Sequence, residues 1–281
     1  MTNSQATGST LYIVATPIGN LEDISLRAIN ILKSVDFILA EDTRHSMQLL
    51  NALGIKNTLR SFHAHNESEK SDLIIEELLA GKSAALISDA GTPLISDPGY
   101  PLVVLARQKN IDVIPIPGAC ALIAALSAAG IACDSFTFQG FLPAKQPARV
   151  AKLQSLSTQT QTVVFYESTH RILDCINDIS AIYGPESSMV LAKELTKTYE
   201  RFISGTVREV QNWLAESSQH IKGEFVLIIP PRTKVADKKP DEELLQVLLE
   251  AMPLKQAVTI ACKLSTTNKN DLYQMALELK K

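Results

Sequence analysis

The sequence has few cysteines, and none are close together. Its 281 residues include four, Cys120, Cys133, Cys175 and Cys262, with no C-x-x-C pair. A disulfide framework or a structural zinc site needs clustered cysteines, so neither is indicated. We therefore expect a reducing, cytoplasmic location and no bound metal.

The common phosphate-binding loops are also missing. The chain contains neither G-x-G-x-x-G nor G-x-x-x-x-G-K-[ST]. A glycine loop without a lysine offers a phosphate only backbone dipoles. A phosphate-rich ligand is therefore disfavoured, and so is an oxidoreductase that uses a dinucleotide.

No apolar run is long and unbroken, and no basic excess is present. Residues 113–133 are uncharged over 21 positions, but two prolines and two glycines interrupt them, which predicts a strand, a turn and a buried helix. Residues 1–10 lack a basic start and an apolar stretch, so we expect a frayed tail and no signal peptide. A net charge of −3 argues against a uniformly basic nucleic-acid-binding surface.

The hydrophobic pattern of the first half alternates strands with helices. Strands are predicted at 11–16, 37–40, 58–63, 84–88 and 112–117, with amphipathic helical patterns between them. This βαβ rhythm predicts an α/β fold whose parallel sheet is covered by helices on both faces.

After residue 134 the rhythm changes. Strands are predicted at 162–168, 187–195, 199–205 and 224–230, and helices at 169–182 and 206–217, which suits a mixed sheet. The predicted organisation is a tail at 1–10, α/β domains at 11–133 and 134–230, a charged, proline-bracketed linker at 231–240 and a small helical domain at 241–281. The last domain should form helices at Asp241–Ala251, Leu254–Leu264 and Asn270–Leu279, too short to bury much core alone.

One loop has the position and the residues of a ligand site. The segment SDAGTPLISDPG, residues 88–99, follows an apolar strand and precedes a helical stretch. Open α/β sheets bind ligands at such strand ends. Its repeated carboxylates and hydroxyls beside tight turns favour a polar or cationic ligand. A second glycine turn, PIGNLEDIS at 17–25, follows the first strand, with Ser25 as the expected helix cap, and two such loops predict one cleft.

Several motifs together resemble a known family. They are ATPIGNLEDIS (15–25), SDAGTPLISDPG (88–99), PIPGACALIAALSAAG (115–130), VVFYESTHRI (163–172) and GEFVLII (223–229), with EDTRHS, FHAHNE and GFLPAK in addition. In this order they are similar to bacterial small-subunit ribosomal RNA methyltransferases that methylate a cytidine ribose. That family has the tetrapyrrole-methylase fold, and the similarity runs from about residue 10 to the end.

The resemblance implies a fold, a cofactor and a substrate. It implies two α/β domains with S-adenosylmethionine folded between them, a homodimer, and 2′-O-methylation of a cytidine, cytidine 1402 in the family, of 16S ribosomal RNA. Backbone groups of Gly91 and Thr92 would receive the methionine and ribose part of the cofactor. The cofactor-binding residues implied are Pro17, Asp89, Gly91, Thr92, Ala119, Cys120, Ala121, Tyr166, Glu167 and Phe225.

Methylation of a ribose hydroxyl needs in-line positioning and a group that takes the proton. The catalytic candidates are Asp42, His63, Glu167 and Lys193. Each has a structural alternative. Asp42 would cap a helix, and His63, like its neighbour His65, would be a surface or hydrogen-bonded histidine. Glu167 would pair with Arg171 four residues on, and Lys193 would lie at a solvated strand edge.

Basic residues gather in one stretch of this acidic chain. No acidic residue occurs at 135–166, where Lys145, Arg149 and Lys152 stand. The RNA-contacting candidates are Arg44, Lys145, Arg149, Lys152 and Arg171, and the linker adds Arg232, Lys234, Lys238 and Lys239. The last 27 residues carry five lysines, which favours RNA or ribosome docking, and the alternative for all of these is a solvated surface.

Two other functions stay open at this stage. One is methylation of a tetrapyrrole, for which a wide apolar pocket would be expected and against which the basic stretch counts. The other is a non-catalytic RNA-binding or ribosome-assembly factor that keeps the fold without the chemistry.

Overall fold

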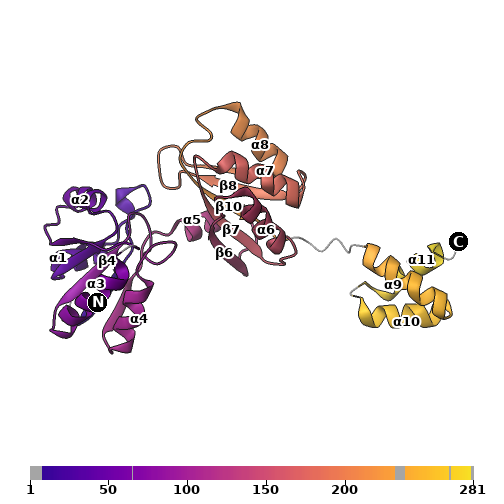
Figure 1. Cartoon of the computed structure of the whole chain (residues 1–281). Helices are drawn as coiled ribbons and strands as arrows, with labels where there is room; N and C mark the ends of the chain where they lie inside the picture. The colour runs from indigo at the N-terminus through magenta and orange to yellow at the C-terminus, as the bar shows by residue number, and fades with distance from the viewer. Residues whose placement is uncertain (1–7, 65, 232–237, 266, 280–281) are drawn as a thin grey trace. The chain divides into compact units, whose positions relative to one another are not determined.

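The structure is a computed structural model that describes residues 8–64, 66–231, 238–265 and 267–279. The described residues fall into two compact units that divide between Pro231 and Arg232 (Figure 1). Each unit is described by itself. The first unit contains both predicted α/β domains. The boundary between these domains, near residue 133, remains a prediction.

The first sheet is parallel throughout. Its strands are β1 (Thr10–Val14), β2 (Phe37–Ala40), β3 (Leu59–Ser61), β4 (Ser83–Ile87) and β5 (Asp112–Ile116). They lie in the order β3-β2-β4-β1-β5, and every neighbouring pair is parallel. The predicted parallel sheet is therefore confirmed.

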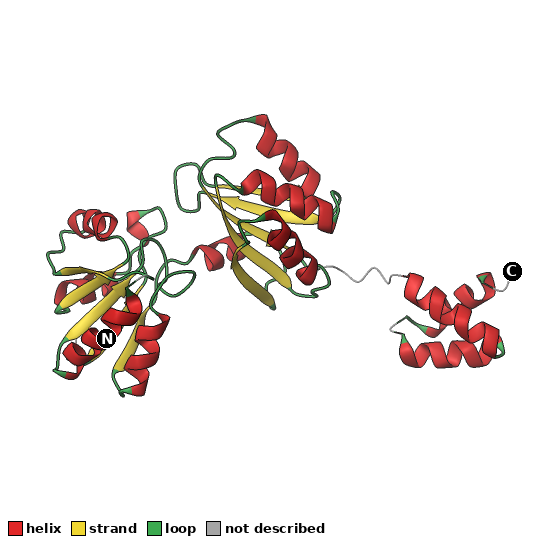
Figure 2. Cartoon of the chain, in the orientation of Figure 1, coloured by secondary structure: helices red, strands yellow, loops and turns green. Residues whose placement is uncertain are grey.

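Helices cover both faces of this sheet (Figure 2). Buried residues of α1 (Leu26–Ser34) and α2 (Thr43–Ala52) pack with Tyr12, Val14 and Ile38 on one face. Those of α3 (Glu67–Leu79) and α4 (Tyr100–Gln108) pack with Leu11, Leu39 and Leu86 on the other. Neighbouring strand positions face opposite layers, so the central strands β1, β2 and β4 are apolar at almost every position.

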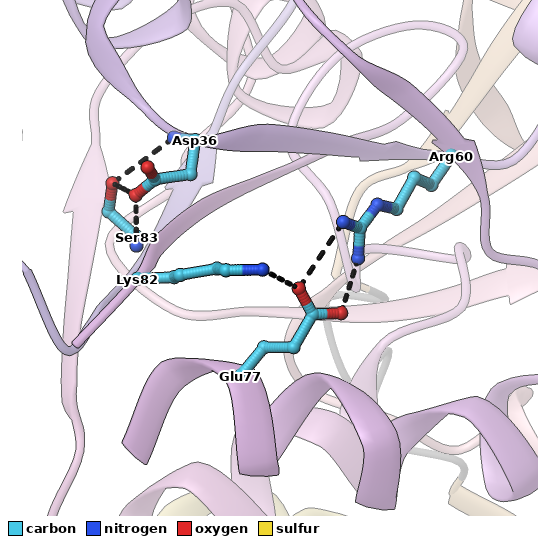
Figure 3. Close-up of polar contacts among 5 residues, drawn as sticks. All are labelled: Asp36, Arg60, Glu77, Lys82 and Ser83. Atoms are coloured by element: carbon cyan, nitrogen blue, oxygen red, sulfur yellow. Dashed lines mark hydrogen bonds and ion pairs between the residues drawn. The ribbon is translucent and has the colours of Figure 1, made fainter. Parts of the chain in front are cut away.

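Hydrogen bonds of charged side chains hold the parallel sheet together at places other than the carboxyl ends of β2 and β4 (Figure 3). Glu77 of α3 accepts hydrogen bonds from Arg60 of β3 and from Lys82, each at 2.6 Å, and these bonds lower the pKa of Glu77 to about 2. Before β2, the Asp36 carboxylate accepts from the backbone and the hydroxyl of Ser83, the first residue of β4, which lowers its pKa. The carboxyl ends of β2 and β4 take no part in these contacts and lead into loops.

The second sheet is mixed, as predicted. Its strands are β6 (Phe136–Phe141), β7 (Thr162–Ser168), β8 (Ser188–Lys193), β9 (Arg201–Thr206) and β10 (Glu224–Ile229), in the order β6-β7-β10-β8-β9. Only β6 and β7 are parallel neighbours. One face packs on α6 (Gln146–Leu156), α7 (Ile172–Tyr183) and α8 (Val207–Glu216), and the other on α5 (Ala121–Ala128).

The uncharged stretch 113–133 contains the end of β5, a loop and α5, as its prolines and glycines predict. No described helix combines the length and the apolar character needed to cross a membrane. A short 3-10 helix, η1 (Leu21–Asp23), follows the first glycine turn, and Ser25 caps α1 as expected. Strand β6 was not among the predicted elements. Its sequence, FTFQGF, has a glycine that breaks the alternation.

The second unit consists of α9 (Lys238–Ala251), α10 (Leu254–Leu264) and α11 (Lys269–Glu278). Helix α9 begins inside the predicted linker, of which residues 232–237 lie outside the described ones. The unit has a small core of its own. Its members are Leu245, Val258, Ala261, Leu272, Met275 and Ala276.

Candidate active site

A cleft of about 370 Å³ lies in the first unit, at the carboxyl ends of its parallel strands. Its walls come from the loops after β1, β2, β4 and β5 and from the ends of β6, β7 and β10. The volume falls in the range of small-molecule sites. It is lined by Ile18, Glu41, Asp89, Ala90, Gly91, Thr92, Ile95, Ser96, Asp97, Cys120, Ala121, Phe141, Tyr166, Glu167, Ser168, Leu195, Glu224, Phe225 and Val226.

The loops after β1 and β4 are joined by an antiparallel bridge. The amide of Thr16 donates to the Gly91 carbonyl at 2.8 Å, and the amide of Gly91 donates back at 3.1 Å. Gly91 has φ +86°, and a Cβ there would lie 3.2 Å from the Ile18 Cγ2 atom. The Thr92 hydroxyl donates to the Ala119 carbonyl at 3.0 Å, which attaches the loop after β5. Three loops distant in sequence thus form one floor.

Beyond this floor the chain takes an uncommon path. Leu94 and Ser96 have φ values of 71° and 72°, a left-handed conformation that costs a side-chain-bearing residue on the order of 1–2 kcal/mol. Gly99, at φ +127°, donates its amide to the Glu67 carboxylate at 2.8 Å, which fixes the end of the loop. The path turns Ser96 and Asp97 into the cleft wall.

Five acidic residues line the cleft, but Glu167 pairs with Arg171 and Glu224 with Lys197. The carboxylates of Glu41, Asp89 and Asp97 therefore set its electrostatic character. Burial raises the pKa of the Glu41 carboxyl, and the nearby charge of Asp89 adds to the effect. Burial also raises the pKa of Asp97 to about 7, with further contributions from Glu41 and Asp89. No lysine or arginine is among the described lining residues, and no described group of His, Cys, Asp or Glu could hold a metal ion. The site therefore favours a cation and opposes further negative charge.

The opposite wall is aromatic and aliphatic. Tyr166 meets Phe138 and Phe141 edge to face, with ring centroids 4.7 and 5.8 Å apart. Its hydroxyl accepts a hydrogen bond from the Leu122 amide at 3.0 Å, which holds the start of α5. Burial raises the pKa of Tyr166, so the phenol stays neutral. This wall can receive an apolar ring.

Most of the predicted cofactor-binding residues line the cleft. They are Asp89, Gly91, Thr92, Cys120, Ala121, Tyr166, Glu167 and Phe225. Pro17 and Ala119 are not lining residues, although Ala119 accepts the hydrogen bond from Thr92. Glu41, Asp97 and Phe141 line the cleft but were not among the predicted site residues. Each had a signal in the sequence: Glu41 directly follows the strand at 37–40, Asp97 is the second aspartate of the repeated loop, and Phe141 belongs to the motif GFLPAK.

Asp42 is exposed and lies outside the cleft lining. Its carboxylate caps α2 by accepting from the amides of Arg44, at 2.8 Å, and His45, at 3.3 Å. The structure thus shows the capping alternative. The Asp42 amide donates to the Asp89 carboxylate at 3.1 Å, so this turn positions a cleft residue. Arg44 is exposed beside it.

Glu167 contacts the cleft but holds its carboxylate elsewhere. Its side chain is fully buried and pairs with Arg171 at 3.3 Å. The residue is opposite Phe225, which belongs to the core beneath α6, α7 and α8. Burial raises the pKa of Glu167. The predicted base is therefore corrected to a structural ion pair, and Arg171 is likewise bound to Glu167 and to the Leu142 carbonyl.

The prediction that Arg149 contacts RNA is also corrected. Arg149 is 3% exposed, and its guanidinium pairs with the buried Asp178 of α7 at 2.7 Å. It joins α6 to α7 and presents no charge to solvent. Lys145 is exposed and Lys152 is half-buried, so these two stay RNA-contacting candidates.

The two other catalytic candidates lie near the cleft without lining it. The His63 ring contacts the Asn66 amide at 3.0 Å, and its proximity opposes the rise in the pKa of Glu41. His65 lies outside the described residues. Lys193 is 7% exposed at the end of β8, opposite Phe225, and none of the ion pairs among described residues includes it.

Comparison with known proteins agrees with this architecture. Residues 10–211 match the family model described as Tetrapyrrole (Corrin/Porphyrin) Methylases, and residues 236–280 match the model described as RsmI C-terminal HTH domain. Among solved structures, uroporphyrin-III-C-methyltransferase from Thermus thermophilus is similar with a TM-score of 0.55 and 19% identity, over 79% of this chain and 94% of that one. A cobalt precorrin-4 methyltransferase also has a TM-score of 0.55, with 16% identity over 79% and 95% of the two chains. These two likenesses show the fold alone.

Curated relatives are much more similar in sequence. The protein named ribosomal RNA small subunit methyltransferase I of Pasteurella multocida is 51% identical over 95% of this chain and 96% of its own length. The proteins of the same name from Haemophilus influenzae and Escherichia coli O157:H7 are 49% and 47% identical, over 95% of this chain and 96% and 94% of theirs. The chain therefore belongs to the tetrapyrrole methylases and, within them, to the family of ribosomal RNA small subunit methyltransferase I.

Proposed function

We propose that this protein transfers the methyl group of S-adenosylmethionine to the ribose 2′-hydroxyl of a cytidine in 16S ribosomal RNA. The observation that carries the proposal is the cleft itself. It combines three carboxylates outside the described ion pairs, an aromatic wall and no lysine or arginine among its described lining residues. A cationic cofactor without phosphate suits it. The relatives that share the ribosomal RNA name cover nearly the whole chain, whereas the likeness to tetrapyrrole enzymes is below 20% identity.

The residues of the cleft fit the cofactor by their chemistry. Glu41, Asp89 and Asp97 supply negative charge for an ammonium or a sulfonium group, while Ile18 and Tyr166 supply apolar surface for an adenine ring. At Gly91 the backbone approaches without a side chain. The bound cofactor would supply an electrophilic methyl group. The chain would supply orientation, exclude water and accept a proton.

Asp97 is the residue to which we assign proton removal. It lines the cleft, whereas Asp42 caps a helix and the Glu167 carboxylate is occupied by Arg171. A base with a pKa of about 7 matches a neutral operating pH. Lys193 is the second assignment, because it is buried beside Phe225 without an ion-pair partner among the described residues.

We assign RNA contacts to the basic stretch of the first unit and, separately, to the second unit. Lys145, at the start of α6, follows the cleft residue Phe141 by four positions and is exposed. Phosphates can bind such side chains without base specificity. The helical unit matches a model named for a helix-turn-helix domain, so a nucleic-acid contact is assigned to it as well. A homodimer and action in the cytoplasm complete the proposal.

The test is transfer of labelled methyl groups to small ribosomal subunits, or to stripped 16S RNA, from cells that lack this activity. Nuclease digestion and mass spectrometry then identify the labelled nucleotide. Label on a cytidine 2′-oxygen is expected. Label on a base, or none despite measurable cofactor binding, would overturn the proposal. Asp97→Asn should abolish transfer, whereas Asp174→Asn, on the exposed side of α7, makes the same chemical change outside the cleft and should not.

The contribution of the second unit is tested separately. Deletion of residues 236–281 should weaken RNA binding and spare cofactor affinity. The second unit has a core of its own, so the deletion removes no core residue of the first unit. Unchanged RNA affinity would refute the role assigned to it.

A further inference from the structure

Phe141 is a large apolar side chain left half in solvent at the cleft. It lines the cleft, yet it is 52% exposed, whereas Phe37, Phe62 and Phe165 are fully buried. Exposed apolar surface of this size carries no folding benefit. Its placement beside a ligand cleft therefore calls for a functional explanation.

The backbone takes a special course to place this ring. Along β6 and β7, Phe138 is paired with Val164, and the next recorded pair is Phe141 with Tyr166. Three steps on β6 thus match two on β7, which defines a β-bulge. Gly140, inside the bulge, has φ +64°.

The extra residue decides which face of the sheet receives Phe141. With regular pairing, Phe141 would be opposite Glu167, whose face is covered by α6, α7 and α8. A shift of one residue exchanges the two faces of a strand. The bulge instead pairs the ring with Tyr166, on the side of the cleft.

The segment after Phe141 is held by a hydrogen bond and ends at the exposed side chain of Lys145. Arg171 donates a hydrogen bond to the Leu142 carbonyl, so the residue next to the ring is held by the ion pair beneath the sheet. Lys145 then stands exposed at the start of α6. A phosphate bound at Lys145 would bring a neighbouring nucleoside to the rim where Phe141 lies.

We propose that Phe141 is the platform on which the base of the acceptor nucleotide stacks while its ribose lies in the cleft. The inference rests on the proposed function, in that the acceptor is RNA, and it names the substrate class as an unpaired nucleoside. A base within a duplex is stacked on both faces by its neighbours and cannot use the platform. Stacking on an aromatic side chain tolerates any base, so this contact sets geometry and not sequence.

The experiment compares Phe141→Ala with Phe141→Trp and with Phe136→Ala. Phe136 lies at the other end of the same strand and is 36% exposed, which makes it a matched control. Phe141→Ala should raise the KM for RNA about tenfold or more, as expected for the loss of one stacked base. The Kd of S-adenosylmethionine should change less than about twofold, and Phe141→Trp should restore the KM.

A second readout needs no turnover. The second readout uses a single-stranded oligonucleotide with one fluorescent pyrrolocytosine. Its fluorescence should be quenched when it binds the wild type or Phe141→Trp, but not when it is mixed with Phe141→Ala. Two results would overturn the inference: an equal loss of cofactor affinity in Phe141→Ala, which would place the ring against the cofactor, or unchanged RNA binding and quenching. If the wild type quenches the oligonucleotide but transfers no methyl group, the proposed function fails and the platform stands.

Discussion

Replacement of Asp97 by asparagine should make the protein more stable, by an amount that grows with pH. Asp97 has a pKa of about 7 in the folded protein against 3.8 for an unperturbed aspartate. Between these values the folded state holds a proton that the unfolded state has lost, so stability falls as the pH rises. Above pH 7 the full cost of the buried charge is present. Asparagine does not titrate and removes this cost.

The size of the effect follows from the pKa difference. About 3 pH units correspond to about 4 kcal/mol, and solvent screening of a half-buried group reduces this to about 1–2 kcal/mol. The gain of Asp97→Asn should therefore be near zero at pH 4, partial at pH 5–6 and complete at pH 8. Neither Glu41 nor Asp89 is removed by this variant, so the rest of the carboxylate cluster stays in place.

Urea unfolding without cofactor, at several pH values, measures this gain. Trp213, the only tryptophan, lies on α8 and reports on the first unit. Asp174→Asn is the control, because Asp174 is exposed and should give no pH-dependent gain. Equal gains at pH 4 and pH 8, or no gain at pH 8, would refute the reasoning. Methyl transfer should be abolished in the same variant, because asparagine cannot accept the proton. A gain in stability with a loss of activity is the usual trade-off at an active site.

Three further predictions concern structure and binding. Arg149→Met should lower the free energy of unfolding by about 3 kcal/mol, because it leaves the Asp178 carboxylate buried without a partner, and calorimetry should show RNA affinity unchanged. Gly91→Ala should weaken cofactor binding about tenfold or more in titration calorimetry, since its φ of +86° and the 3.2 Å contact oppose a Cβ. Thr206→Ala should cost about 1 kcal/mol in thermal unfolding, because the capping box with Glu209 is lost at the start of α8.

The predictions that depended on local rules agree best with the structure. Ser25 caps α1, and the proline- and glycine-interrupted stretch is a strand, a loop and α5, because caps and breakers act within a few residues. The alternation of apolar strands and helices also sufficed for the parallel sheet, since its central strands β1, β2 and β4 are buried on both faces.

The predictions that failed depended on partners distant in sequence or on register. Arg149 was counted as a surface charge because nothing in its neighbourhood indicates Asp178, 29 residues away. Glu167 follows Phe165 by two positions and shares its buried face, a signal that strand alternation could have provided. Phe141 faces the cleft only because of a bulge, and single-sequence periodicity cannot place a bulge.

The way in which the cleft is assembled has a consequence for biosynthesis. Its walls begin at Ile18 and end at Val226, so almost the whole first unit must be synthesised and folded before the site exists. A nascent chain that lacks β10 would have neither Phe225 nor Val226 and could not hold ligand in the complete cleft. Ligand affinity therefore reports that the first unit is complete. A ligand that binds only the finished site can stabilise the first unit only after β10 has been synthesised.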